Sequence, residues 1–100
     1  MLVRVYFYKE NGADLITRLV KISRMALDTV YELVWEMEFK NVLSPGRIWL
    51  KFKEEDNPFG ISLKSNRTHH KVAIGDIIQI VEEYYLVVDV GVKKITVVND

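Results

Sequence analysis

The stretch that decides the fold runs from residue 77 to residue 98 and reads IIQIVEEYYLVVDVGVKKITVV. Three runs of β-branched and aromatic residues, at 77–81, 84–90 and 92–98, are separated by Glu82-Glu83 and by Gly91. Such runs are typical of β-strands, and the short breaks between them indicate tight connections. This end of the chain therefore predicts strands that return on one another in an antiparallel sheet.

The first residues of the chain predict another strand. Positions 2–8 alternate between two faces, one with Val3, Val5 and Phe7 and the other with Arg4, Tyr6 and Tyr8. Residues 9–12 predict a turn, because Asn11-Gly12 tolerates the positive φ angles that tight turns require. Residues 15–22 are rich in β-branched side chains and predict a returning strand, with a helix as the competing interpretation.

One principal helix is predicted from Ser23 to Phe39 or Lys40. Ser23 is a suitable N-cap, and no glycine or proline follows before Pro45. Thr29 and Glu32 have capping-box spacing, which would place the start of the helix later. At about 100° per residue, a broad apolar face opposes a polar stripe of acidic residues. The apolar face consists of Ala26, Leu27, Val30, Tyr31, Leu33, Val34 and Met37.

The middle of the chain predicts a turn at 44–46, a strand at 47–53, a short strand at 61–64 and a polar loop at 65–71. We therefore expect an α+β fold in one domain, residues 1–100, with a curled, mostly antiparallel sheet or partial barrel and one principal helix. The expected core consists of Val3, Val5, Phe7, Val30, Val34, Met37, Ile48, Leu50, Phe52, Ile77, Ile78, Val87 and Ile95.

Composition narrows the class of protein. Hydrophobic residues make up 49% of the chain and the formal net charge is zero, so the sequence favours a folded domain over disorder. Bulk attraction to nucleic acid or to anionic lipid is not expected from a neutral chain. There is no cysteine, which excludes disulfides and thiolate chemistry. Arg4 interrupts the first apolar run and no run reaches the roughly 20 residues of a membrane span, so we expect no membrane partner and a cytoplasmic location.

Two segments carry a resemblance to a known group. Residues 66–78, NRTHHKVAIGDII, and residues 84–91, YYLVVDVG, resemble the YodL-like group of small proteins from bacteria, phages and plasmids. That group shows an Arg or His, a Ser-Val-Gly-Asp-Val core, and a hairpin with a Tyr and a Gly. Ala73-Ile74 replaces Ser-Val here, and Val92 stands where an aromatic residue usually follows the last glycine. The resemblance implies an accessory protein, of a mobile element or virus or with a housekeeping role, and supplies no chemistry to carry over.

The titratable residues do not predict a catalytic or metal site. His69 and His70 are adjacent, so on a strand they would point to opposite sides, and metal sites need spacings at which the ligands converge. Gly75-Asp76 predicts a turn, in which Asp76 would need one of these histidines as a partner for acid–base chemistry. An enzyme that uses His69 or His70 with Asp76 is a third hypothesis, ranked after an interaction protein and a nucleic-acid-binding module. We assign no catalytic residue, no metal and no cofactor.

Two aromatic residues suggest the first functional hypothesis. Trp35 and Phe39 fall beside the acidic stripe of the predicted helix and off its core-facing arc. Exposed large aromatics are typical of interaction surfaces, and strand-rich domains also leave sheet edges open to pairing. We therefore expect a non-enzymatic interaction protein that binds itself or another protein, self-associating through Trp35, Phe39 and a sheet edge.

The alternative hypothesis is a small nucleic-acid-binding module. Aromatic and basic residues alternate on the two predicted strands at 2–8 and 47–53. If these strands are neighbours, the sheet presents aromatic rings for stacking on bases and cations for phosphates, and the basic loop at 64–71 extends the patch. The residues of this hypothesis are Tyr6, Tyr8, Arg47, Trp49, Lys51, Lys53 and Arg67.

Overall fold

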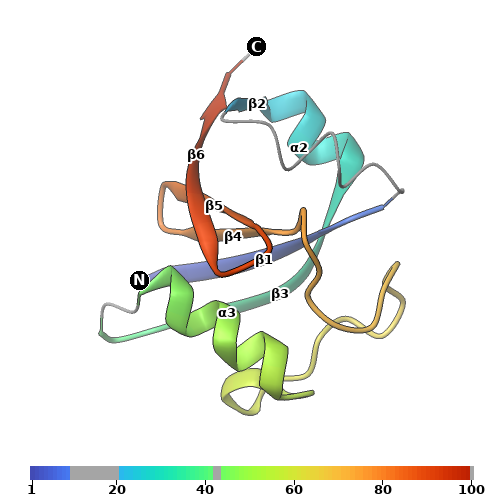
Figure 1. Ribbon diagram of the computed structural model, residues 1–100, viewed down its shortest axis with the longest axis vertical. Coiled ribbons are helices and arrows are strands. Elements are labelled where there is room, and N and C mark those ends of the chain that lie inside the picture. Colours follow the sequence, from blue (N-terminus) through green and yellow to red (C-terminus); the bar gives the residue numbers. More distant parts are fainter. Residues whose placement is uncertain (10–20, 42–43, 100) are drawn as a thin grey trace.

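The computed structural model describes residues 1–9, 21–41 and 44–99. Its centre is a six-stranded sheet with the order β2-β6-β5-β4-β1-β3 (Figure 1). The strands are β1 (Leu2–Tyr8), β2 (Lys21–Ser23), β3 (Tyr31–Glu38), β4 (Ile77–Ile80), β5 (Glu83–Val87) and β6 (Val92–Val98). The helical elements of the described residues are α2 (Arg24–Val30), α3 (Pro45–Glu54) and the short 3-10 turn η1 (Pro58–Gly60).

The predicted α+β class is confirmed, but its finer description is wrong in two respects. The sheet is open, since β2 and β3 lie at its two ends, so the expected curled sheet or partial barrel is not formed. Every pairing is antiparallel except the parallel pair of β2 and β6. Two α-helices replace the one principal helix, and Figure 1 shows α2 beside β2 and α3 across the other end of the molecule. Neither is long and apolar enough to cross a membrane.

The two ends of the chain fold much as predicted. β1 occupies an interior place between β4 and β3, and its alternating residues Val3, Val5 and Phe7 are fully buried. The C-terminal runs form β4, β5 and β6 as three consecutive antiparallel strands. The predicted strand at 15–22 corresponds in part to β2. Residues 15–20, and residues 10–12 of the predicted turn at 9–12, lie outside the described residues.

The predicted helix from Ser23 to Phe39 is wrong beyond Val30. Ser23 does cap a helix, and its Oγ accepts a hydrogen bond of 3.0 Å from the Ala26 amide. The chain then becomes extended at Tyr31 and pairs with β1 as the edge strand β3. A bulge shifts the register between Val5 and Tyr6, leaving Val34 and Trp35 adjacent and both buried. Two consecutive buried residues break the period of two that identifies a strand, and this made the segment look helical.

The predicted strand at 47–53 is helix α3. Ser44 caps it by accepting a hydrogen bond of 3.3 Å from the Arg47 amide, and Pro45 occupies its first turn. Ile48 and Phe52 stand one helical turn apart and are both buried, whereas Leu50 is 45% exposed. The alternating apolar residues Ile48, Leu50 and Phe52 match the period of a strand, whereas the Ser44 cap and Pro45 favour a helix. The predicted short strand at 61–64 is not a strand either.

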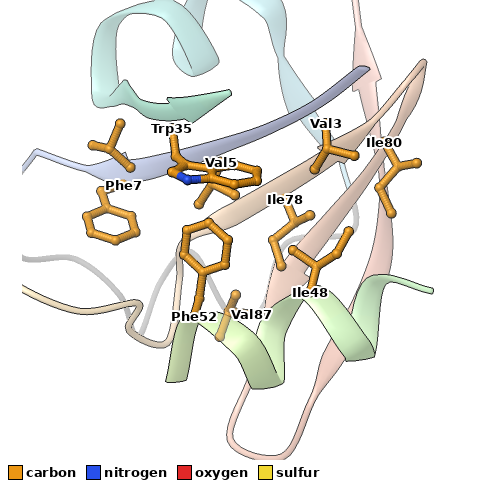
Figure 2. Packing of buried hydrophobic residues seen from close by; sticks show 10 residues of the cluster. Val3, Val5, Phe7, Trp35, Ile48, Phe52, Ile78, Ile80 and Val87 are labelled. Carbon is orange, nitrogen blue, oxygen red and sulfur yellow. The ribbon is translucent and has the colours of Figure 1, made fainter. Parts of the chain in front are cut away.

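The two helices pack on opposite faces of the sheet. Figure 2 shows the cluster beneath α3, where Ile48 and Phe52 meet side chains from β1, β3, β4 and β5. Residues of the opposite face, among them Ile77 of β4, Leu86 of β5 and Ile95 of β6, form a second cluster with Leu27 of α2. Most of the predicted core is confirmed. Val30 and Leu50 are wrong, because Val30 at the end of α2 is 38% exposed and Leu50 on the outer side of α3 is 45% exposed, and Met37 is only half-buried.

Candidate interaction surface around the β4–β5 turn

The turn between β4 and β5 holds an unusual backbone. Val81 has φ of 57°, a left-handed conformation that β-branched residues rarely adopt, and its side chain is 49% exposed. Its amide donates to the Leu2 carbonyl at 2.9 Å, and its carbonyl accepts from Gln79 Nε2 at 2.7 Å. These bonds hold the turn in a conformation that costs about 1–3 kcal/mol, and such positions are found most often at functional sites.

A row of polar side chains crosses the sheet next to this turn. The registers place Glu36, Arg4, Gln79 and Tyr84 opposite one another on β3, β1, β4 and β5, so they share the sheet face on which α2 packs. Arg4 Nε donates to Glu36 Oε2 at 2.5 Å. Gln79 is nearly buried and accepts a hydrogen bond of 2.6 Å from the Tyr6 hydroxyl. The row is therefore fixed in place by its own hydrogen bonds.

Helix α2 adds a second guanidinium to this row. Its first residue, Arg24, follows the Ser23 cap and lies over the Tyr84 ring, with Cζ 5.7 Å from the ring centroid. A hydrogen bond with Tyr84 raises the pKa of Arg24, and a hydrogen bond with Glu36 raises the pKa of Arg4. Both guanidinium groups therefore stay charged at any physiological pH.

These residues border a shallow depression of about 410 Å³, with Arg4, Arg24, Gln79, Tyr84, Val81 and Glu82 in its lining. A second depression of about 510 Å³ lies on the other side of the turn and is lined by Glu82, Glu83 and Tyr85 among others. Tyr84 and Tyr85 point to opposite faces of β5, so the turn separates a side with two arginines from a side with two glutamates. Val81 and Glu82 border both depressions.

The acidic side of the turn is partly neutralised within the chain. Glu83 accepts hydrogen bonds from the Tyr85 hydroxyl at 2.7 Å and from Lys94 Nζ at 3.1 Å. These bonds, with that of Tyr85 the larger, lower the pKa of the Glu83 carboxyl. Glu82 is exposed at the tip of the turn and carries its charge next to the exposed Val81.

The predicted surface of Trp35 and Phe39 is not exposed as expected. Trp35 is 3% exposed, packs edge-on against Phe52, and donates from Nε1 to the Ile61 carbonyl at 3.1 Å. Phe39 is half-buried, and its ring meets that of Phe59 at a centroid distance of 5.0 Å. The prediction is wrong because it placed both residues on a helix, whereas the bulged strand β3 turns Trp35 into the core.

The residues of the nucleic-acid hypothesis are not brought together on one face. Tyr6 and Tyr8 pack against the cluster on the α2 side of the sheet, whereas Trp49 belongs to α3 and packs against the cluster on the opposite face. On α3, Lys53 Nζ lies 4.9 Å from the Trp49 centroid, while Arg47 is exposed. Lys51 pairs with Glu55 at 2.8 Å. Arg67 donates to the backbone carbonyls of Lys64 and His70 in a loop.

The structure brings His69 and Asp76 together, which are two of the residues named in the enzyme hypothesis. His69 Nε2 lies 2.7 Å from Asp76 Oδ2, and Asp76 is fully buried. His70 instead is exposed, and neither histidine lies on a strand. In the part of the chain that the structure describes, no three His, Cys, Asp or Glu side chains gather in a way that could hold a metal ion.

Sequence reasoning missed the turn surface. Four of the residues that line the arginine-side depression belong to no sequence motif: Arg24, Gln79, Val81 and Glu82. They come together only because α2 and the β4–β5 turn meet at the same part of the sheet. One feature of the sequence did indicate an unusual turn at this place. A two-residue hairpin connection normally contains Gly, Asn or Asp, and Val81-Glu82 contains none of them.

Comparison with protein-family models, with curated proteins and with solved structures finds no match for this chain. The resemblance of residues 66–78 and 84–91 to the YodL-like group therefore stays a prediction. The function is inferred below from the geometry of the chain itself.

Proposed function

We propose that the protein is a small non-enzymatic interaction domain that associates with a second copy of itself through the surface around the β4–β5 turn. This turn surface consists of Arg4, Arg24, Val81, Glu82 and Tyr84. One observation carries the proposal: the exposed Val81 stands between a depression lined by Arg4 and Arg24 and one lined by Glu83, and Glu82 borders both.

A surface of this kind is complementary to itself. In a two-fold dimer the same patch is used on both copies, so a residue i that meets residue j is matched by j meeting i. With the two-fold axis near Val81, Glu82 of each copy faces Arg24 of the other, and the two valines meet at the centre. An apolar centre with a charged rim is the usual anatomy of a protein interface.

The chemistry of the turn surface favours binding over catalysis. Arginine cannot be deprotonated in a protein, and glutamine does not titrate, so Arg4, Arg24 and Gln79 offer no general base. Gln79 is also fully engaged with Tyr6 and with the Val81 carbonyl. What these side chains supply is a fixed pattern of donors and charges, which gives an interface its register and specificity.

The test is sedimentation velocity across a dilution series, with Arg24→Glu and Glu82→Arg as charge-reversed variants. Each variant alone places like charges across the two-fold axis and should be monomeric at concentrations where the wild type dimerises. An equimolar mixture of the two variants restores opposite charges at both contacts, so the dimer should return. The double variant R24E/E82R should dimerise for the same reason.

A matched control carries the same charge changes on α3, away from the turn. Lys53→Glu and Glu54→Arg lie on exposed positions at the C-terminal end of that helix and should leave the dimer unaffected. The proposal fails if the wild type is monomeric at the highest concentration reached, or if the mixture of charge-reversed variants stays monomeric. It also fails if the α3 variants weaken association as strongly as the turn variants.

A further inference from the structure

Two arginines from different elements meet at the arginine-side depression next to the β4–β5 turn. Arg4 on β1 and Arg24 at the start of α2 both line this depression, which has a volume of about 410 Å³. Gln79 and Tyr84 complete its sheet side and are 9% and 6% exposed. The depression is therefore formed by side chains that the sheet itself holds in place.

Arg4 is fixed by two neighbours and keeps donors to spare. Its Nε donates to Glu36 Oε2 at 2.5 Å, and this bond, with a smaller contribution from a hydrogen bond with Tyr6, raises the pKa of Arg4. The Tyr6 hydroxyl in turn donates to Gln79 Oε1 at 2.6 Å. A guanidinium carries five N–H donors in a planar fork. One carboxylate oxygen and one hydroxyl therefore leave Arg4 with donors for a further acceptor.

Arg24 carries a charge that no direct ion pair with a described residue neutralises. Among residues 1–9, 21–41 and 44–99, no carboxylate lies within 4.0 Å of its guanidinium. Asp28, one helical turn further along α2, acts on Arg24 only at longer range. A second depression of about 360 Å³ reaches Arg24 from its other side, and Asn99 borders both depressions. The exposed guanidinium is thus accessible to a ligand.

Two guanidinium groups around one depression suit a phosphate group. The arginine fork matches the oxygens of a phosphate in pairs, and charge-assisted bonds of this kind are about twice as strong as neutral ones. A phosphate monoester offers three acceptor oxygens and a charge of about −1.5 to −2 at neutral pH, so it can engage both arginines at once. The volume of about 410 Å³ also lies within the range of small-molecule sites, about 300–1,000 Å³.

One carboxylate at the rim opposes an anion. Glu82 is exposed at the tip of the turn and borders the depression. Glu36 already balances the charge of Arg4, so the local net charge is close to zero. We therefore expect recognition through direct hydrogen bonds from the two guanidinium groups, with the exposed charge of Glu82 weakened by solvent and salt.

We infer that the arginine-side depression binds a phosphate group, either as free phosphate or as the phosphate of a small phosphorylated molecule, with Arg24 and Arg4 as its donors. The rest of a phosphorylated molecule would contact Val81, Val97 and Asn99, which also line the depression. This binding does not require self-association. One consequence does rest on the proposed function: phosphate and Glu82 of a second copy compete for Arg24, so phosphate should dissociate the dimer.

The test is an NMR titration of the isotope-labelled protein with sodium phosphate, with sodium chloride at matched ionic strength as the reference. The Nε–Hε signals of Arg4 and Arg24 and the amide of Glu82 should shift to saturation with phosphate and not with chloride. Glycerol phosphate is titrated in the same way. Tighter binding of the ester identifies a phosphorylated small molecule as the ligand, and equal or weaker binding identifies free phosphate.

Three variants assign the binding to this depression. Arg24→Gln should weaken phosphate binding by about ten-fold, because it removes charge-assisted hydrogen bonds. Lys53→Gln removes the same charge from α3 on the opposite face of the sheet and should change the affinity by less than about two-fold. Glu82→Gln removes the like charge at the rim and should tighten binding by roughly two-fold, although it weakens the proposed dimer.

The inference is overturned if phosphate causes no saturable shift beyond that of chloride, or if Arg24→Gln binds phosphate as tightly as the wild type. It is also overturned if Lys53→Gln weakens binding as much as Arg24→Gln. Sedimentation velocity of the same samples separates the two proposals. A monomeric wild type whose Arg24 signal shifts with phosphate contradicts self-association alone, whereas a dimer without such a shift contradicts the phosphate site alone.

Discussion

The Trp35 ring meets the Phe52 ring edge-on, with a centroid distance of 4.9 Å and an interplanar angle of 85°. This contact joins β3 to α3, the two elements that local patterns assign to the wrong class. Aromatic pairs in this geometry contribute about 0.5–1.5 kcal/mol beyond the burial of their area. The pair therefore helps each segment to keep the structure that its own sequence pattern does not favour.

The first prediction tests helix α3. Ile48→Ala should lower the free energy of unfolding by about 2–5 kcal/mol, because Ile48 is fully buried beneath the sheet. Leu50→Ala removes a similar side chain from the solvent side of the same helix and should cost less than about 1 kcal/mol. Urea unfolding of the two variants measures both values. Equal losses would indicate a strand at 47–53 and contradict the helix.

The second prediction concerns the strained turn. Val81→Gly should raise the free energy of unfolding by about 1 kcal/mol, because glycine adopts the left-handed conformation without steric cost. The same change removes the apolar centre of the turn surface, so it should weaken self-association. Thermal unfolding and sedimentation velocity measure the two effects. Val90→Gly, at a position that is 87% exposed and has no positive φ, is the control and should give no gain.

The third prediction concerns the caps of the two helices. Ser23→Ala and Ser44→Ala each remove a hydroxyl that accepts a hydrogen bond from the first turn of a helix. Each change should lower the free energy of unfolding by about 1 kcal/mol. Ser65→Ala, at an exposed position of the irregular segment between η1 and β4, should leave stability within about 0.5 kcal/mol of the wild type. Chemical denaturation of the three variants decides whether the caps act as the structure indicates.

The fourth prediction concerns the pH dependence of global stability. The pKa of Asp76 is raised from its ordinary value of 3.8, chiefly by burial, so its ionisation opposes folding. Its contribution is fully present below that ordinary value and is lost as the pH rises through the higher folded value. Asp76→Asn cannot ionise, so its stability relative to the wild type should improve across this window. Urea unfolding at several pH values measures the difference, and a difference that stays constant would contradict the shift.

The sequence by itself determined the α+β class, β1 with its buried face, and the three strands at the C-terminus. These elements have patterns that agree with their final structure, since β1 alternates cleanly and β4 is buried along its whole length. The Ser23 cap was also readable, because a cap is a local interaction between a hydroxyl and an amide a few residues on.

Only the tertiary structure decided which secondary structure residues 31–39 and 47–53 adopt. The bulge that turns both Val34 and Trp35 inward exists only because β3 pairs with β1, and the burial of Ile48 and Phe52 on one helical face exists only because a sheet lies beneath them. The turn surface and the packing of His69 between Asp76 and Phe7 depend in the same way on contacts between distant segments. Local patterns record the period of a segment, whereas pairing partners and burial on each face are set by what packs against it.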